Sequence, residues 1–236
     1  MFATLGHIAM KSFMLVWIYT SPHSWRGLPK PDAGPPVLVD GPHVHRILLC
    51  GSGVAVGYGV ASQELALGGS IARSLAALTG RGIEVTTIAS PRVTTKAAKS
   101  QLTTRVLNGM DAVILSFGTF EALTFVPTRA WGLDLTELVD ALLADAPNAQ
   151  IFVISCNAPK MSRFIAAYQR HVLQFAAAYN TQIRMLAQQR DRVHHVEFAP
   201  EPEDPEAIEG RQSYRAWADA IAPAVAKELS RPAADD

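Results

Sequence analysis

The residues best suited to chemistry follow the first apolar run of the regular part of the chain. Gly51–Gly59 has the sequence GSGVAVGYG, with four glycines and the hydroxyl group of Ser52. Glycines let a backbone turn sharply and approach a ligand closely, which suits either a phosphate cradle or a tight strand-to-helix turn. A serine in such a turn is also a candidate nucleophile where a base lies within hydrogen-bond reach.

A dinucleotide site is not predicted at this turn, because two further features are missing. A short-chain dehydrogenase needs a tyrosine followed four residues later by a lysine, and none of the five tyrosines is followed in that way. The second predicted strand ends at Ile88–Ser90 with no acidic residue to bind a ribose hydroxyl. No cofactor is therefore expected.

The histidines do not predict a metal site. His43 and His45 precede the first predicted strand, and His194 and His195 begin the fifth. Successive side chains of a strand point to opposite faces, so His194 and His195 cannot bind one metal together. Both also lie at the amino end of their predicted strand, whereas ligands bind at the carboxyl ends.

Five apolar, β-branched runs alternate with segments of helical period. These runs and segments must position the glycine-rich turn and the other candidate residues. The pattern predicts an α/β fold in which helices cover both faces of a five-stranded parallel sheet. The residues that follow each run are the ones expected to line a site. The predicted strands are Ile47–Cys50, Ile83–Ile88, Ala112–Phe117, Ile151–Cys156 and Val193–Phe198.

Three intervening segments carry an apolar stripe at helical spacing. Ser62 and Asp134 are the predicted N-caps of the first two helices. The stripes are Leu67, Ile71, Leu75 and Leu78; Leu135, Leu138, Val139 and Leu142; and Tyr214, Trp217, Ala218, Ile221 and Val225.

Composition favours one globular domain without affinity for nucleic acid. The chain has 236 residues, 49% of them apolar, and its 21 basic and 21 acidic residues give a net charge of zero. No long-range positive field is available to attract nucleic acid. Cys50 and Cys156 end apolar runs and are expected to be small buried side chains, so the redox compartment is not indicated.

The first 25 residues carry one formal charge, Lys11, and leave three interpretations open. A signal peptide would use Phe13–Tyr19 as its apolar core, but no Ala-x-Ala site follows. A membrane span is interrupted by Lys11 and His7. An apolar helix that lies on a membrane surface or docks on the domain is the third. Residues 26–45 are predicted to be a Pro-rich extended connector.

Four stretches beyond the connector resemble the conserved blocks of SGNH (GDSL-type) hydrolases. The segment from Arg46 to Gly80 is similar to the first block, IASPRVTTKAA to the second, LSFGTFEALT to the third, and EDPEAIEGRQSYRAWADAIAPAVAKEL to the last. The resemblance implies a three-layer flavodoxin-like domain over residues 46–230, followed by a short tail at 231–236. It also implies an esterase-type hydrolase, provided that the reactive residues are present.

In the first two blocks the reactive positions are substituted. The family's nucleophilic serine falls on Gly53, which has no side chain, and the aspartate before it falls on Ser52. The glycine whose backbone N–H helps to bind the oxyanion falls on Arg92. Ser52 remains as the candidate catalytic hydroxyl. To place Ser52 at the nucleophile position, however, the alignment must shift by one residue, and this shift displaces the nucleophile from the tight turn.

The third and last blocks are substituted as well. Gly118 is retained, but the oxyanion-binding asparagine falls on Phe120 and the following acid on Glu121. The aspartate and histidine of the last block fall on Pro205 and Ile208. Loss of one triad member or one oxyanion donor slows hydrolysis by orders of magnitude, and these groups act as a unit.

Two functions stay open. One is a degenerate, pseudoenzyme member of the family that binds a small-molecule, acyl or lipid ligand or a protein partner, with residues 1–25 as a contact to a membrane surface. The other is an active esterase, lipase-like hydrolase or acyltransferase in which Ser52, Arg92 and Glu121 take altered roles. The sequence does not identify the compartment and leaves a cytoplasmic and a membrane-associated location open. Because a buried guanidinium needs a partner, Arg92 is expected to pair with Glu121, with Phe120 and Ile208 narrowing the pocket.

Overall fold

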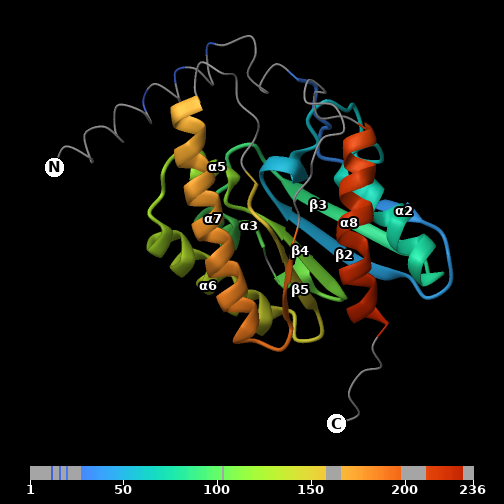
Figure 1. The fold of residues 1–236 in the computed structure, drawn as a ribbon. Helices are drawn as coiled ribbons and strands as arrows, with labels where there is room; N and C mark the ends of the chain where they lie inside the picture. The colour runs from blue at the N-terminus through green and yellow to red at the C-terminus, as the bar shows by residue number, and fades with distance from the viewer. Residues whose placement is uncertain are drawn as a thin grey trace.

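The computed structural model describes residues 28–102, 104–157, 166–197 and 211–230, together with Ser12, Val16 and Thr20. Within these ranges, six strands form one mixed sheet, and helices cover both of its faces (Figure 1). The strands are β1 (Val37–Val39), β2 (His45–Gly51), β3 (Ile83–Ala89), β4 (Ala112–Ser116), β5 (Gln150–Ile154) and β6 (Val193–Val196). The helices are η2 (Gly53–Val56), α2 (Leu67–Thr79), α3 (Thr95–Gln101), α4 (Thr104–Leu107), α5 (Thr119–Leu123), α6 (Thr128–Asp145), α7 (Ala166–Gln188) and α8 (Arg211–Leu229).

The predicted parallel sheet is confirmed. The strand order is β1-β3-β2-β4-β5-β6, and each neighbouring pair from β3 to β6 is parallel. The five parallel strands have the flavodoxin-like order, in which β2, the first of the five along the chain, lies between β3 and β4. The carboxyl ends of the five parallel strands therefore lie along the same side of the sheet, which we call its carboxyl edge. The four family blocks were expected at this carboxyl edge.

The sixth strand was not predicted. Val37–Val39, inside the stretch predicted to be a connector, pairs antiparallel with β3 at the edge of the sheet. The preceding residues are also attached to the domain: the carbonyl oxygen of Pro29 accepts a hydrogen bond from the Gly59 N–H at 2.8 Å. Pro31 is buried, and its ring lies beside Gly57, where a Cβ atom would come within 2.9 Å of Pro31 Cγ. We call residues 28–32 the strap, because they cross the glycine-rich turn.

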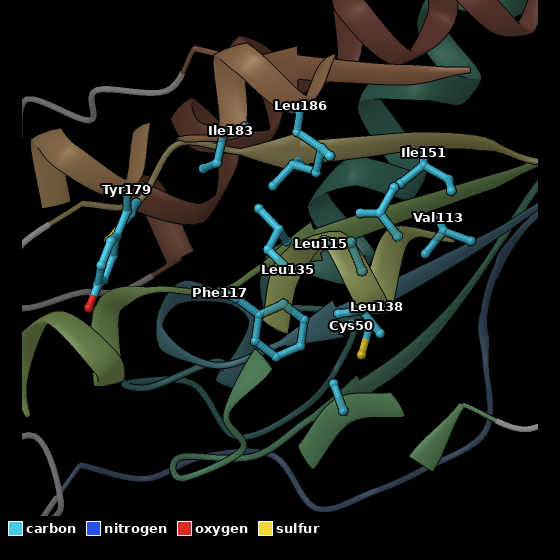
Figure 2. Close-up of a cluster of buried hydrophobic side chains, with 14 of the residues drawn as sticks. Cys50, Val113, Leu115, Phe117, Leu135, Leu138, Ile151, Tyr179, Ile183 and Leu186 are labelled. Carbon is cyan, nitrogen blue, oxygen red and sulfur yellow. The ribbon is translucent and has the colours of Figure 1, made fainter. Parts of the chain in front are cut away.

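The core has two parts, one on each face of the sheet. On one face, α2 and α8 pack on the sheet through Leu67, Ile71, Leu75 and the predicted stripe of α8. On the other face, α3, α6 and α7 cover a cluster that includes Leu115, Phe117, Leu135 and Tyr179 (Figure 2). Burial of so many apolar side chains on both faces is what holds the strand ends in register.

Three details of the predicted helices were wrong. Leu78 is 55% exposed, because it lies beside the buried stripe near the end of α2. Ser62 does not cap α2, which begins at Leu67 after Ala66. Asp134 lies inside α6, which begins at Thr128. α6 follows Pro127, which makes no side-chain cap, and Trp131 near its start is buried in the core.

Candidate functional site

Hydrogen bonds join three turns at the carboxyl ends of β2, β3 and β4. The Ser52 N–H donates to the Ser116 carbonyl at 2.8 Å, and the Ser116 hydroxyl donates back to the Ser52 carbonyl at 3.1 Å. The Ser90 N–H donates to the Gly51 carbonyl at 3.1 Å. The turns that carry the first three family blocks are therefore brought together, as the sequence predicts.

At Gly53, on which the sequence resemblance places the family's nucleophile, the backbone is left-handed, with a φ of 58°. This conformation costs an L-residue about 1–2 kcal/mol. A Cβ atom at this position would lie 3.2 Å from Thr119 Oγ1 and 3.4 Å from Thr119 Cβ. The side chain of Thr119 therefore borders the space in which a nucleophile at residue 53 would start, and its hydroxyl donates to the Asn157 carbonyl at 3.1 Å.

Ser52 is the candidate nucleophile that remained after the sequence analysis. Its side chain is buried, with 1% exposure, and among the described residues its hydroxyl has no hydrogen-bond partner. A serine is activated by a base within hydrogen-bond reach. No described side chain supplies that base to Ser52, so this part of the structure does not support the nucleophile role.

Glu121 is part of the structural support of the site. Its side chain is buried, and Oε1 accepts hydrogen bonds from the backbone N–H and the hydroxyl of Thr95, both at 2.7 Å. Oε2 accepts from the Gly118 N–H at 3.2 Å. The carboxylate thus links the start of α3 to the start of α5 and fixes the second-block turn relative to the third.

The expected pair of Arg92 and Glu121 was wrong. Arg92 is exposed, and the ion pairs between described residues do not join it to Glu121. Because Thr95 and Gly118 already donate to both oxygens of Glu121, the buried carboxylate does not need a guanidinium partner. Phe120 is half-buried, while Pro205 and Ile208 lie outside the described residues.

The two cysteines are buried beside this region, as predicted, and are not in a disulfide. Burial raises the pKa of the Cys50 thiol to about 12. Burial also raises the pKa of the Cys156 thiol, and the nearby Glu121 carboxylate raises it further. Both thiols are protonated at neutral pH, so neither is a reactive nucleophile.

A second serine lies beside a histidine one strand away. Ser155 follows β5, and its hydroxyl lies 2.9 Å from His195 Nε2. Burial lowers the pKa of His195, and the positive charge of Arg184 lowers it further, although Glu197 opposes this shift. The imidazole is therefore neutral at neutral pH and able to accept the Ser155 proton.

The histidine placement corrects one prediction and confirms another. His195 lies one residue from the carboxyl end of β6, because the strand ends at Val196 and not at Phe198. It is therefore close to the functional edge of the sheet. His194 and His195 do point to opposite faces: His194 contacts Gln150 and stacks on Phe152, whereas His195 contacts Ser155.

Two further features concern ligands. In the described part of the chain, no cluster of three or more histidine, cysteine or acidic side chains could bind a metal ion. A cavity of about 120 Å³ lies between α3 and α6, away from Gly53. Its lining is Lys99, Leu102, Leu107, Leu138, Ala141, Leu142 and Asp145.

No helix within the described ranges has both the length and the apolar character of a membrane span.

The sequence matches the GDSL-like lipase/acylhydrolase family over residues 50–222, which is most of the chain. Together with the fold and the arrangement of the block turns, this shows that the chain belongs to that family. The resemblance seen in the sequence is thereby confirmed. A search of curated protein sequences found no match.

Solved structures show the same fold at low sequence identity. A family 3 carbohydrate esterase from Clostridium thermocellum is 15% identical, with a TM-score of 0.61, and the match covers 80% of this chain and 100% of that one. The esterase EstA from Pseudoalteromonas sp. is 15% identical, with a TM-score of 0.59 and coverages of 79% and 100%.

A family two carbohydrate esterase from Cellvibrio japonicus is a longer relative. It is 14% identical, with a TM-score of 0.58 over 81% of this chain. This chain spans 63% of the length of that enzyme. At these identities the likeness establishes the fold, and catalysis has to be judged from this chain's own residues.

Three contacts at the site were not predicted from the sequence. Thr119 borders the Gly53 turn, Thr95 donates to Glu121, and Ser155 contacts His195. Each joins side chains from separate turns or strands, so no local pattern signals them. Strand register could have indicated the last contact, because Val153 pairs with His195 and Ser155 is the next residue on the same face.

Proposed function

We propose that this chain binds a small-molecule, acyl or lipid ligand, or a protein partner, at the family site without hydrolysing it. The observation that carries the proposal is the Gly53 turn. The nucleophile position has no side chain, its backbone is left-handed, and Thr119 borders the space where the side chain would extend.

The surrounding groups support the same proposal. The Glu121 carboxylate accepts hydrogen bonds from Thr95 and Gly118, so it is not available to orient a histidine. Ser52 has no base within the described residues. Hydrolysis at this turn would need a nucleophile, a base and an oxyanion donor to act together.

Hydrolysis of short-chain p-nitrophenyl esters by the purified chain tests the proposal. We expect no turnover above a heat-inactivated control, and the Ser52→Ala and Thr119→Ala variants should behave like the parent. Turnover that disappears in either variant would contradict the proposal, because it would identify a working hydroxyl at the turn.

A second candidate function rests on Ser155 and His195. The 2.9 Å contact between a hydroxyl and a neutral imidazole is the geometry of a nucleophile and its base, and it supports an acyl-transfer enzyme with an altered constellation. Among the residues that the structure describes, an oxyanion site for Ser155 is the missing part. The Ser155 N–H donates to the Val196 carbonyl, and the Cys156 N–H donates to Asn180 Oδ1.

Labelling with a fluorophosphonate distinguishes this candidate from the first. The first proposal predicts no covalent adduct on the intact chain. An adduct mapped to Ser155, present in the parent and lost in His195→Gln, would instead establish the altered constellation. Gln keeps a polar side chain at residue 195 while removing the basic nitrogen, so the variant separates basicity from packing.

A further inference from the structure

Two stretches of the sequence contain cations and no acids. Residues 1–31 contain Lys11, Arg26 and Lys30, and residues 85–110 contain Arg92, Lys96, Lys99 and Arg105. The whole chain has 21 acids in 236 residues, so 57 residues would carry about five at the average density. A neutral chain thus has a local excess of positive charge in these two stretches.

In the second stretch, the basic side chains of α3 lie on its solvent side. Lys96 and Lys99 are exposed and three residues apart, which places them on one side of the helix. Thr95 and Ala98 form the buried side. Arg92 is exposed in the turn before the helix. We call Arg92, Lys96 and Lys99 the basic face.

The strap places the end of the first stretch, residues 28–31, at the same edge of the sheet. β1 runs antiparallel to β3, so the chain arrives from the carboxyl ends of the parallel strands. The Pro29–Gly59 hydrogen bond and the buried Pro31 fix this arrival beside the glycine-rich turn. The turn before Arg92 contacts the same region, since the Ser90 N–H donates to Gly51. The continuous described chain, which begins at Leu28, therefore enters the domain next to the candidate site.

The composition of residues 1–27 matches a bilayer interface. Phe13–Tyr19 is an uninterrupted apolar run, and Trp17, Tyr19 and Trp25 are aromatic residues of the kind enriched at the membrane–water boundary. Lys11 and Arg26 flank this run, and no acid occurs before Asp32. Apolar insertion and attraction to anionic headgroups would act together in such a segment.

We propose that the carboxyl edge of the sheet docks on an anionic lipid bilayer. Residues 1–27 enter the interface, and the basic face contacts the headgroups. The candidate site then opens toward the lipid, which makes an acyl or lipid molecule its accessible ligand. This inference goes beyond the proposed function and holds whether or not the site hydrolyses its ligand.

Sedimentation of the full chain with lipid vesicles tests the proposal. We expect binding to vesicles that contain phosphatidylglycerol, weaker binding to pure phosphatidylcholine, and a decrease as salt is raised. Lys96→Gln/Lys99→Gln should weaken binding to the anionic vesicles about tenfold or more. The double variant removes two positive charges from exposed positions without changing the buried side of α3.

Lys227→Glu is the matched control. It changes the net charge by the same two units, but Lys227 is exposed in the last turn of α8, at the opposite end of the sheet (Figure 1). Its binding to vesicles should equal that of the parent. Equal weakening in both variants would overturn the proposal, because net charge and not the basic face would then control binding.

Tryptophan fluorescence tests the role of residues 1–27 separately. Trp131 and Trp217 are buried in the domain, whereas Trp17 and Trp25 lie in the proposed docking segment. Anionic vesicles should shift the emission to shorter wavelength in the parent and not in Trp17→Phe/Trp25→Phe. No shift in the parent, no binding to vesicles, or binding to duplex DNA in place of vesicles would each overturn the proposal.

Discussion

Substitution of Gly53 by serine tests the description of the nucleophile turn. The variant introduces the serine that the sequence resemblance places at this position, but the φ of 58° is unfavourable for any L-residue. The backbone cost is about 1–2 kcal/mol. The new Cβ would also lie 3.2 Å from Thr119 Oγ1, so Thr119 must shift, and overpacking of this kind costs about 1–3 kcal/mol.

Gly80→Ser is the matched control for the backbone term. Gly80 has a similar φ of 66°, but a Cβ there would have no neighbour within 4 Å. We expect Gly80→Ser to lose about 1–2 kcal/mol of unfolding free energy and Gly53→Ser to lose about 2–5 kcal/mol. In a chain of this size, each kcal/mol corresponds to about 2–4 °C in melting temperature.

Thermal and denaturant unfolding of both variants measure the difference. Thr119→Ala should reduce the extra loss in Gly53→Ser, because it removes the hydroxyl that the new Cβ meets, and the double-mutant cycle gives the coupling between the two positions. A Gly53→Ser variant as stable as the parent, with Gly80→Ser destabilised, would refute the reasoning. The turn would then already accommodate the family's serine.

Three further predictions follow from other contacts. Glu121→Gln should lower the unfolding free energy by about 2–4 kcal/mol in denaturant titrations, since its amide would face the Thr95 and Gly118 N–H donors, and an unchanged midpoint would contradict the assigned role. NMR titration should show the pKa of His195 below its usual value of 6.5. As the pH falls below 6.5, the parent should lose stability relative to His195→Gln, because the unfolded state binds the proton more readily than the folded state. Removal of residues 1–33 should destabilise the domain by about 1–3 kcal/mol relative to removal of 1–27, because only the longer deletion removes the Pro29 hydrogen bond and the buried Pro31; equal stability would show that the strap contributes nothing.

The last of these predictions replaces one that the sequence alone suggests. A Pro-rich stretch before the first parallel strand predicts a separable connector, and a chain beginning at Gly34 would then fold normally. The structure attaches the strap and β1 to the domain instead. Proline content predicts extended backbone, but it does not show whether that backbone pairs with a sheet edge.

The sequence predicted the elements of the fold well and the contacts of the site poorly. Five strands and the buried stripes of α6 and α8 follow from local periodicity, and all were confirmed. The partner of Glu121 depends on which donors lie closest after folding. Charge alone favoured Arg92, but the N–H and hydroxyl of Thr95 satisfy the buried carboxylate, and Arg92 stays exposed.

Native mass spectrometry of the gently purified chain, before and after incubation, tests the central claim most directly. The account predicts a noncovalent ligand that leaves the protein with its mass unchanged, and a polypeptide mass that equals the sequence at both times. A covalent acyl adduct, or a ligand that loses its acyl group during the incubation, would contradict the account and show that this member of the family retains hydrolytic chemistry.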